Sequence, residues 1–319
     1  MVRIRQGWLV ALGLGVGLGL FTACKKDDKA GTSGDQAGDK AGAASDDLSL
    51  LPVDSEVVLG INIEQLMNNP MVKKFIEPML KSGAAQARLA EVTAKCGFDP
   101  MMAVKSVVVG VKGAGGNQPT AVIVAHGLDK AKDLECFEKT KDEAVKDGDE
   151  VTRTGDILTI KGKRGQVAIA FTSDTTAVML VSDTADVPAV KAVIAGNSGL
   201  KTSPAFLDMY KKLKTTDSVW AIANGKVLDG LPVKATAAFG SLNLTDGVTV
   251  DGRMRFDTPE AAAQAAELIK GQGKQAAAYV DKMDATVEGT EVHSSVVVSN
   301  QKLQSLMPLL TMVFGGLGQ

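Results

Sequence analysis

The sequence predicts an α+β protein in which twisted antiparallel sheets carry helices packed on one face. Short apolar runs bounded by glycine, proline or asparagine recur along the chain, as expected of strands. Some runs alternate apolar and polar residues, for example 249–256, which is typical of an antiparallel sheet with one covered face. Segments with helical periodicity separate the groups of strands, so both kinds of element are expected to share a core.

The first half of the folded region is expected to open with a strand at 56–63. Asn69 and Pro70 then supply an N-cap and a proline at the first helical position. Gly97 is a natural C-terminal residue for a helix over 84–96. The other elements expected in this half are strands at 106–111 and 120–125, a helix at 129–146, strands at 150–153, 157–161, 166–171 and 176–181, and a short helix at 187–195.

The second half repeats this order. Ser203 and Pro204 cap a helix as Asn69 and Pro70 do, and the sequence Asp257-Thr-Pro-Glu260 forms a capping box for an alanine-rich helix. The expected elements are a helix at 205–213, strands at 218–223, 236–244 and 248–256, a helix ending near Val280, two strands around Glu288-Gly289, and an apolar helix at 301–314. This repetition predicts a diverged internal duplication, with units at 50–200 and 201–319.

The N-terminus carries features of an export signal. Arg3 and Arg5 precede an apolar stretch that stops at Leu20-Phe-Thr-Ala-Cys24. This stretch resembles the lipobox of bacterial lipoproteins, although Phe21 stands where that motif usually has leucine. The resemblance implies that residues 1–23 are a signal peptide and that Cys24 is acylated, which would anchor the chain to a lipid bilayer. The alternative is an uncleaved membrane anchor, and both interpretations place the rest of the chain outside the cytoplasm.

Residues 24–49 are expected to form a disordered tether, because small and charged residues there cannot bury apolar surface. A flexible coil of this length spans roughly 25–30 Å. The residue after Cys24 is Lys25 rather than aspartate, which by resemblance to the lipoprotein sorting system implies the outer membrane, in its periplasmic or surface-facing leaflet.

Further motifs resemble a family of lipoproteins from myxobacteria and their relatives. They are Pro52-x-Asp-Ser55 before a strand, the helix capped by Asn69-Pro70, and Cys96-Gly-Phe-Asp-Pro100. The resemblance spans most of residues 51–300. It implies an envelope protein and brings no activity and no cofactor.

Cys96 and Cys136 remain as an even pair once Cys24 is lipidated, in a compartment that favours oxidation. We therefore predict a disulfide between them, which would close a loop of about 40 residues and contribute roughly 4 kcal/mol. The alternative is two buried free thiols.

The chain's charge and motifs argue against several functions. With 35 Lys+Arg against 37 Asp+Glu, the chain lacks the basic footprint of a nucleic-acid binder. His126 and His293 have no partners at ligand spacing, so no metal site is predicted and both are interpreted as ordinary strand residues. Ser-x-x-Lys occurs at Ser198 and Ser299 without the other elements of the penicillin-binding signature. The chain is expected not to be an enzyme.

Met67, Met71, Phe75 and Met79 recur at four-residue steps. They predict either a groove for an acyl chain or partner helix, or a core-facing helix stripe. The preferred function is a non-enzymatic binding or scaffold module of the cell envelope with an unidentified partner. The alternative is a carrier that holds lipid or another apolar ligand between sheet and helices, and an envelope enzyme ranks third.

Overall fold

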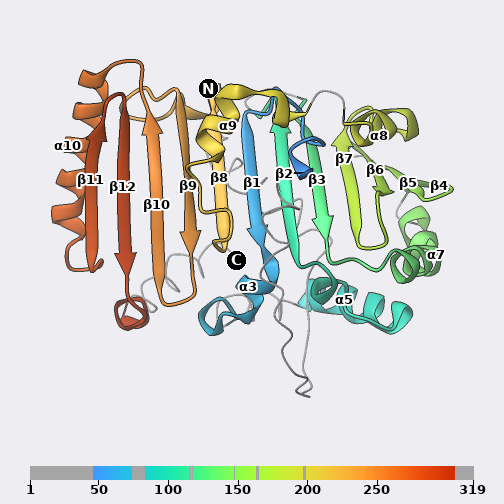
Figure 1. The fold of residues 1–319 in the computed structure, drawn as a ribbon. Helices are drawn as coiled ribbons and strands as arrows, with labels where there is room; N and C mark the ends of the chain where they lie inside the picture. The colour runs from blue at the N-terminus through green and yellow to red at the C-terminus, as the bar shows by residue number, and fades with distance from the viewer. Residues whose placement is uncertain are drawn as a thin grey trace, which may run out of the picture.

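The computed structural model describes residues 46–73 and 83–305, apart from 115, 117, 147, 163, 164, 197 and 198. A single sheet of 12 strands runs across the molecule in the order β11-β12-β10-β9-β8-β1-β2-β3-β7-β6-β5-β4 (Figure 1). Every neighbouring pair is antiparallel. The strands are β1 (Val57–Asn62), β2 (Ser106–Lys112), β3 (Thr120–His126), β4 (Glu150–Thr154), β5 (Ile157–Gly162), β6 (Gly165–Phe171), β7 (Thr176–Ser182), β8 (Val219–Asn224), β9 (Ala237–Asn243), β10 (Val248–Arg255), β11 (Lys282–Glu288) and β12 (Glu291–Val298).

Side chains that the sequence singles out as caps fix the start of several helices. Asn69, Ser203 and Thr258 each accept a hydrogen bond from a backbone N–H two or three residues further on. Asp186 does the same for Ala189. The helices are α3 (Ile63–Asn68), α5 (Gly83–Cys96), α6 (Pro100–Ala103), α7 (Lys130–Lys146), α8 (Val187–Ile194), α9 (Pro204–Tyr210) and α10 (Pro259–Ala276), with 3-10 turns η1 (Leu200–Thr202) and η2 (Gly225–Leu228).

The strand register assigns each side chain to one of two sides of the sheet. Residues paired across neighbouring strands share a side, and successive residues along a strand alternate. Val58 lies opposite Ile222 of β8 and Gly110 of β2, so these positions share one side, which we call the covered face. Leu59 and Val109, which pair with each other, point to the other side, which we call the open face.

The main core lies on the covered face. Residues 48–51, α8, η1 and α9 pack over the central strands there and bury Val58, Val122, Val178 and Ile222 to 1% exposure or less. The Trp220 ring lies directly over Gly60, where an added Cβ would come within 2.1 Å of the indole. Any larger residue at that position would therefore displace the ring.

Two helices lie on the opposite side, at the ends of the sheet. Ala262, Ala265 and Ala266 of α10 pack in a second core with Val292 and other residues of the outer strands. At the other end, Arg153 of β4 points to the open side, since it pairs with Leu158, and it bonds to Glu138 of α7. The expectation of several sheets with helices on one face is thus wrong: there is one sheet, and helices lie on both sides of it, because the strands at its ends also carry apolar residues on the second side, such as Leu158 and Val292.

The two halves of the chain share part of their connectivity (Figure 1). In the first half β1, β2 and β3 are neighbours, a helix follows, and the last strand, β7, returns beside β3. In the second, β8, β9 and β10 are followed by α10, and β12 returns beside β10. The first half carries the additional hairpin β4–β5. Shared connectivity does not require common ancestry, so the duplication with units at 50–200 and 201–319 stays a prediction.

Candidate functional site

The open face of the central strands is the candidate binding surface. Its side chains are apolar across six strands. Along each strand they alternate with the side chains that point to the covered face. They are Val57, Leu59 and Ile61 of β1, Val107, Val109 and Val111 of β2, Ala121, Ile123 and Ala125 of β3, Met179 and Val181 of β7, Val167 and Ile169 of β6, and Val219 and Ala221 of β8.

Burial differs between the two faces of the same strands. Along β2, Val108 on the covered face is 5% exposed, while Val107 and Val109 on the open face are half-buried. β1 and β8 show the same alternation. A sheet face that meets water normally carries polar side chains. The open face does not, so the sequence of these strands calls for a second layer on this side.

The described helices on this side contact the ends of the sheet, where α7 meets β4 and α10 meets β11 and β12. α3 meets β2 at the end where β1 leaves the sheet. Six neighbouring strands about 4.8 Å apart give an apolar surface about 25 Å wide between these helices. None of the described helices contacts β1, β3 or β8 as extensively as α10 contacts β11 and β12. An apolar surface of this extent is typical of an interaction site.

The predicted methionine stripe is described in part. Met67 in α3 and Met71 are half-buried near the end of β1. Phe75 and Met79 lie outside the described residues, so the groove stays a prediction. The side chain of Asn69, between the two methionines, is buried and bonds to the carbonyl of Leu244 in the β9–β10 connection.

Cys96 and Cys136 form the disulfide that the cysteine count predicts, with their Cα atoms 4.8 Å apart. It joins the last residue of α5 to the middle of α7, and so fixes α5 beside the helix at the β4 end of the sheet. Cys24 lies outside the described residues, and its lipidation stays a prediction.

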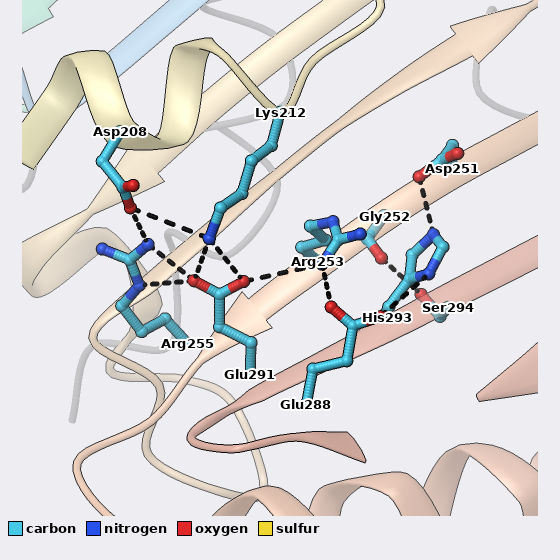
Figure 2. A network of polar contacts seen from close by, with 10 residues as sticks. All are labelled: Asp208, Lys212, Asp251, Gly252, Arg253, Arg255, Glu288, Glu291, His293 and Ser294. Carbon is cyan, nitrogen blue, oxygen red and sulfur yellow. Dashed lines mark hydrogen bonds and ion pairs between the residues drawn. The ribbon is translucent and has the colours of Figure 1, made fainter. Parts of the chain in front are cut away.

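A network of charged side chains occupies the covered face at the other end of the sheet (Figure 2). Glu291 of β12, which is 7% exposed, accepts hydrogen bonds from Lys212 at 2.9 and 3.0 Å and from Arg255 at 2.6 and 2.9 Å. Arg255 also bonds to Asp208 of α9, and Arg253 lies 3.6 Å from Glu291. The network therefore fixes α9 to β10 and β12.

We call this network of Asp208, Lys212, Arg253, Arg255 and Glu291 the charged clamp, because its opposite charges pair with one another and hold α9 against the sheet. Burial alone raises the pKa of Glu291, but hydrogen bonds from Lys212 and Arg255 outweigh it and hold that pKa below its usual value. The adjoining gap, lined by Lys212, Phe239 and Arg253, is too narrow to admit a water molecule. These cations are engaged by carboxylates, so the network is not a ready anion site.

Each histidine lies on a strand beside carboxylates, and His293 Nδ1 also lies 3.9 Å from Glu288. His293 Nε2 is 2.9 Å from Asp251, and His126 Nε2 is 2.8 Å from the buried Asp47. His126 Nδ1 is 3.2 Å from the Thr176 hydroxyl, which brings an acid, a histidine and a hydroxyl together. The ring nitrogens are reversed relative to a Ser-His-Asp triad, in which Nε2 faces the nucleophile. The pair instead secures residues 46–50 to β3.

Two further findings bear on ligand chemistry. Among residues 46–73 and 83–305, no group of three His, Cys, Asp or Glu side chains is placed to hold a metal ion. A surface hollow of about 280 Å³ between β4–β6 and the start of α8 is lined by polar residues, including Glu150, Thr159, Lys161 and Gln166, and by the apolar residues Ile160, Ala185, Val187 and Pro188.

The sequence matches no protein-family model and no characterised protein. The fold is similar to that of TP0453, for which crystal form IV gives a TM-score of 0.51 at 11% identity, covering 85% of this chain and 99% of the other. Crystal form III gives a TM-score of 0.50 at 10% identity, covering 82% and 96%. At such low identity the likeness shows the fold alone. In the part of the chain that the structure describes, no helix is both long and apolar enough to cross a membrane.

Proposed function

We propose that this chain is a cell-envelope lipoprotein, anchored through acylated Cys24, whose folded part is a non-enzymatic binding module. Its binding surface is the open face. The observation that carries the proposal is the run of apolar side chains across β6, β7, β3, β2, β1 and β8 on a side where the described helices cover only the ends of the sheet.

Other features support an exported location. The stretch Leu20–Cys24 resembles a lipobox, and a disulfide such as that between Cys96 and Cys136 persists in oxidising compartments. Residues 46–49 were expected to belong to the tether at 24–49, but they are part of the fold, since Asp47 and Leu48 are only 4% and 1% exposed. The shorter tether 24–45 would let either face of the sheet turn toward the bilayer or toward a partner. The outer membrane is the proposed site, because Lys25 rather than aspartate follows the acylated cysteine.

A carrier of lipid or another apolar ligand is the second candidate. It is favoured by the chemistry of the open face, whose members are valine, leucine, isoleucine, alanine and methionine. Such a surface offers dispersion contacts and few hydrogen bonds, which suits acyl chains as well as an apolar protein segment.

A photo-crosslinking amino acid at position 109 tests the binding surface in cells that export and anchor the chain. Irradiation is expected to yield an adduct with a lipid or with another protein, identified by mass spectrometry. The matched control is position 249, where Thr249 is exposed on the covered-face side of β10. Adducts at position 249 alone, or none at either position, would contradict the proposal.

Anchoring is tested separately by fractionating cells that express the chain or its Cys24→Ala variant. The unaltered chain should sediment with membranes and carry the added mass of acyl chains on Cys24. An unmodified Cys24 in the membrane fraction would contradict the lipoprotein assignment and leave the uncleaved anchor.

A further inference from the structure

The strands β11 and β4 form the two ends of the sheet, and among the described residues each has a strand partner on one side only (Figure 1). We propose that β11 is a dimerisation edge, at which two copies of this chain pair their β11 strands antiparallel about a two-fold axis. The sheet then continues from one copy into the other. Such a dimer requires neither ligand binding by the open face nor acylation of Cys24, so it goes beyond the proposed function.

The free side of β11 is accessible to another strand. α10 packs on one face of β11, where Ala285 belongs to the core that the helix and the strand share. The remaining residues of the strand, apart from Met283, are exposed: Lys282, Asp284, Thr286, Val287 and Glu288. Hydrogen bonds between strands lie in the plane of the sheet, so a helix on one face leaves the edge open to pairing.

The β11–β12 hairpin determines which backbone groups point outward from the edge. Glu288 and Glu291 pair across the two-residue turn Gly289-Thr290, and the pair that flanks such a turn is hydrogen-bonded. At the other end of the hairpin the Val297 carbonyl accepts a hydrogen bond from the Asp281 N–H, so it also points toward β11. Because direction alternates along a strand, the even-numbered residues of β11 bond to β12. The residues whose N–H and C=O point outward are Met283, Ala285 and Val287.

These outward groups restrict how a second copy can pair. Outward groups must meet outward groups, so the possible antiparallel registers differ by steps of two residues. The register centred on Ala285 pairs all 7 residues of β11 with those of the copy. In this register Lys282 of each copy lies opposite Glu288 of the other, and Met283 lies opposite Val287.

Charge favours this register over its two neighbours. A register centred on Asp284 places two copies of that carboxylate opposite each other, and one centred on Thr286 places Asp284 opposite Glu288. Like charges directly opposite each other destabilise a strand pair, whereas opposite charges stabilise it. Charged side chains on an edge strand normally prevent pairing with other chains. Those of β11 therefore exclude unrelated strands and admit a second copy in one register.

The edge at β4 lacks this complementarity. β4 has 5 residues, and in the register that pairs all of them with a copy Glu150 lies opposite Thr154. No opposite charges meet in that register. Arg153 of β4 is also engaged within its own chain, because it donates to Glu138 of α7. A second copy is therefore expected at β11 and not at β4.

Charge exchange across the two-fold axis tests the pairing. Lys282→Glu and Glu288→Lys are introduced separately into chain 25–319, made without the signal peptide, and self-association is measured by analytical ultracentrifugation over a concentration series. Each variant places like charges opposite each other, so its self-association should be about tenfold weaker than that of the unaltered chain. Mixed in equal amounts, the two variants again place opposite charges at both pairs and should form heterodimers with the unaltered affinity.

Recovery in the mixture separates lost pairing from an effect within one copy, where Glu288 also pairs with Arg253. The matched control is Glu150→Lys on the other edge, which should leave self-association unchanged. A chain that stays monomeric over the whole series would overturn the proposal. Variants that associate as the unaltered chain does, or that fail to recover when mixed, would also overturn it.

A photo-crosslinker at position 287 tests the same edge in cells that export the full chain. The expected product is a covalent dimer in which two copies of the tryptic peptide 283–302 are joined, and only two chains can supply two copies. A crosslinker at position 151 on β4 is the control and should give no such product. At position 287, a crosslink to residues 74–82 or 306–319 would mean that the chain itself occupies the edge. That result, a crosslink to another protein, or no crosslink would overturn the proposal.

Discussion

The central strands and the outer strands β10, β12 and β11 meet the demands of burial in different ways. In the outer strands one side carries charged residues such as Arg253 and Glu291, and α10 covers the other side. In the central strands both sides are apolar, and the main core of the described chain lies on the covered face. A sheet that is apolar on both sides is a three-layer design, so the third layer must be another segment, a ligand or a partner.

The largest expected effect lies at the β4 end, where the disulfide holds α5 to α7. Replacing both Cys96 and Cys136 by serine should lower the free energy of unfolding by about 4 kcal/mol, because the unfolded chain loses a closed loop. Urea denaturation monitored by circular dichroism measures it. A loss below about 1 kcal/mol would mean that α5 contributes little to this end of the sheet.

Disrupting the charged clamp should lower the free energy of unfolding by a somewhat smaller amount. Glu291→Gln leaves Lys212 and Arg255 partly buried with their shared partner neutral, so we expect a loss of about 2–3 kcal/mol in urea denaturation. The matched control is Glu267→Gln, which removes an exposed pair with Lys270 and should cost less than about 0.5 kcal/mol. Equal effects from both substitutions would show that the clamp does not secure α9.

Paired truncations compare the two faces directly. Val122→Ala removes methyl groups from a fully buried site on the covered face and should cost about 2 kcal/mol. Val109→Ala on the open face should cost about half as much, because its side chain remains half-buried. Equal losses in chemical denaturation would indicate that both faces are equally well packed in the free protein.

The smallest expected effect is a loss of folding stability at acidic pH. The pKa values of Glu291 and Asp251 lie below their usual values, because the hydrogen bonds from Lys212 and Arg255 and from Lys214 and His293 outweigh burial. The unfolded chain then binds protons first, so this stability is present above about pH 5 and is lost as pH falls through the lowered values. Unfolding midpoints from pH 6 to pH 3 should decline less steeply in Glu291→Gln than in the unaltered chain.

Local structure was largely predictable from the sequence. The expected strands, and the expected helices that lie within the described residues, coincide with the observed ones to within a few residues, because caps such as Ser203 and Thr258 mark where helices begin. The helices α3 and α6 were not expected, and the helix expected at 301–314 lies largely outside the described residues. The apolar character of both faces of the central strands was not predicted, because the other strands were expected to alternate apolar and polar residues as 249–256 does. β2, SVVVGVK, has no such alternation, and a continuous apolar run is the signal of a strand covered on both sides.

Long-range arrangement could not be predicted in the same way. β1 pairs with β8, about 160 positions further along the chain, and no local pattern encodes that contact. Part of the clamp does leave a signal, because Asp251, Arg253 and Arg255 alternate along one strand and so share a side. Their partner Glu291 lies on β12, and only the β10–β12 register brings it within reach.

The most direct test of the central claim compares charge on the two faces of chain 25–319, made without the signal peptide. Val109→Asp places a carboxylate within the open face, and Thr249→Asp places one on the exposed, already charged side of β10. With the open face as the binding surface, Val109→Asp should abolish binding of 1-anilinonaphthalene-8-sulfonate while Thr249→Asp leaves it intact. If Val109→Asp folds cooperatively and binds the dye as tightly as Thr249→Asp, the open face is not the binding surface.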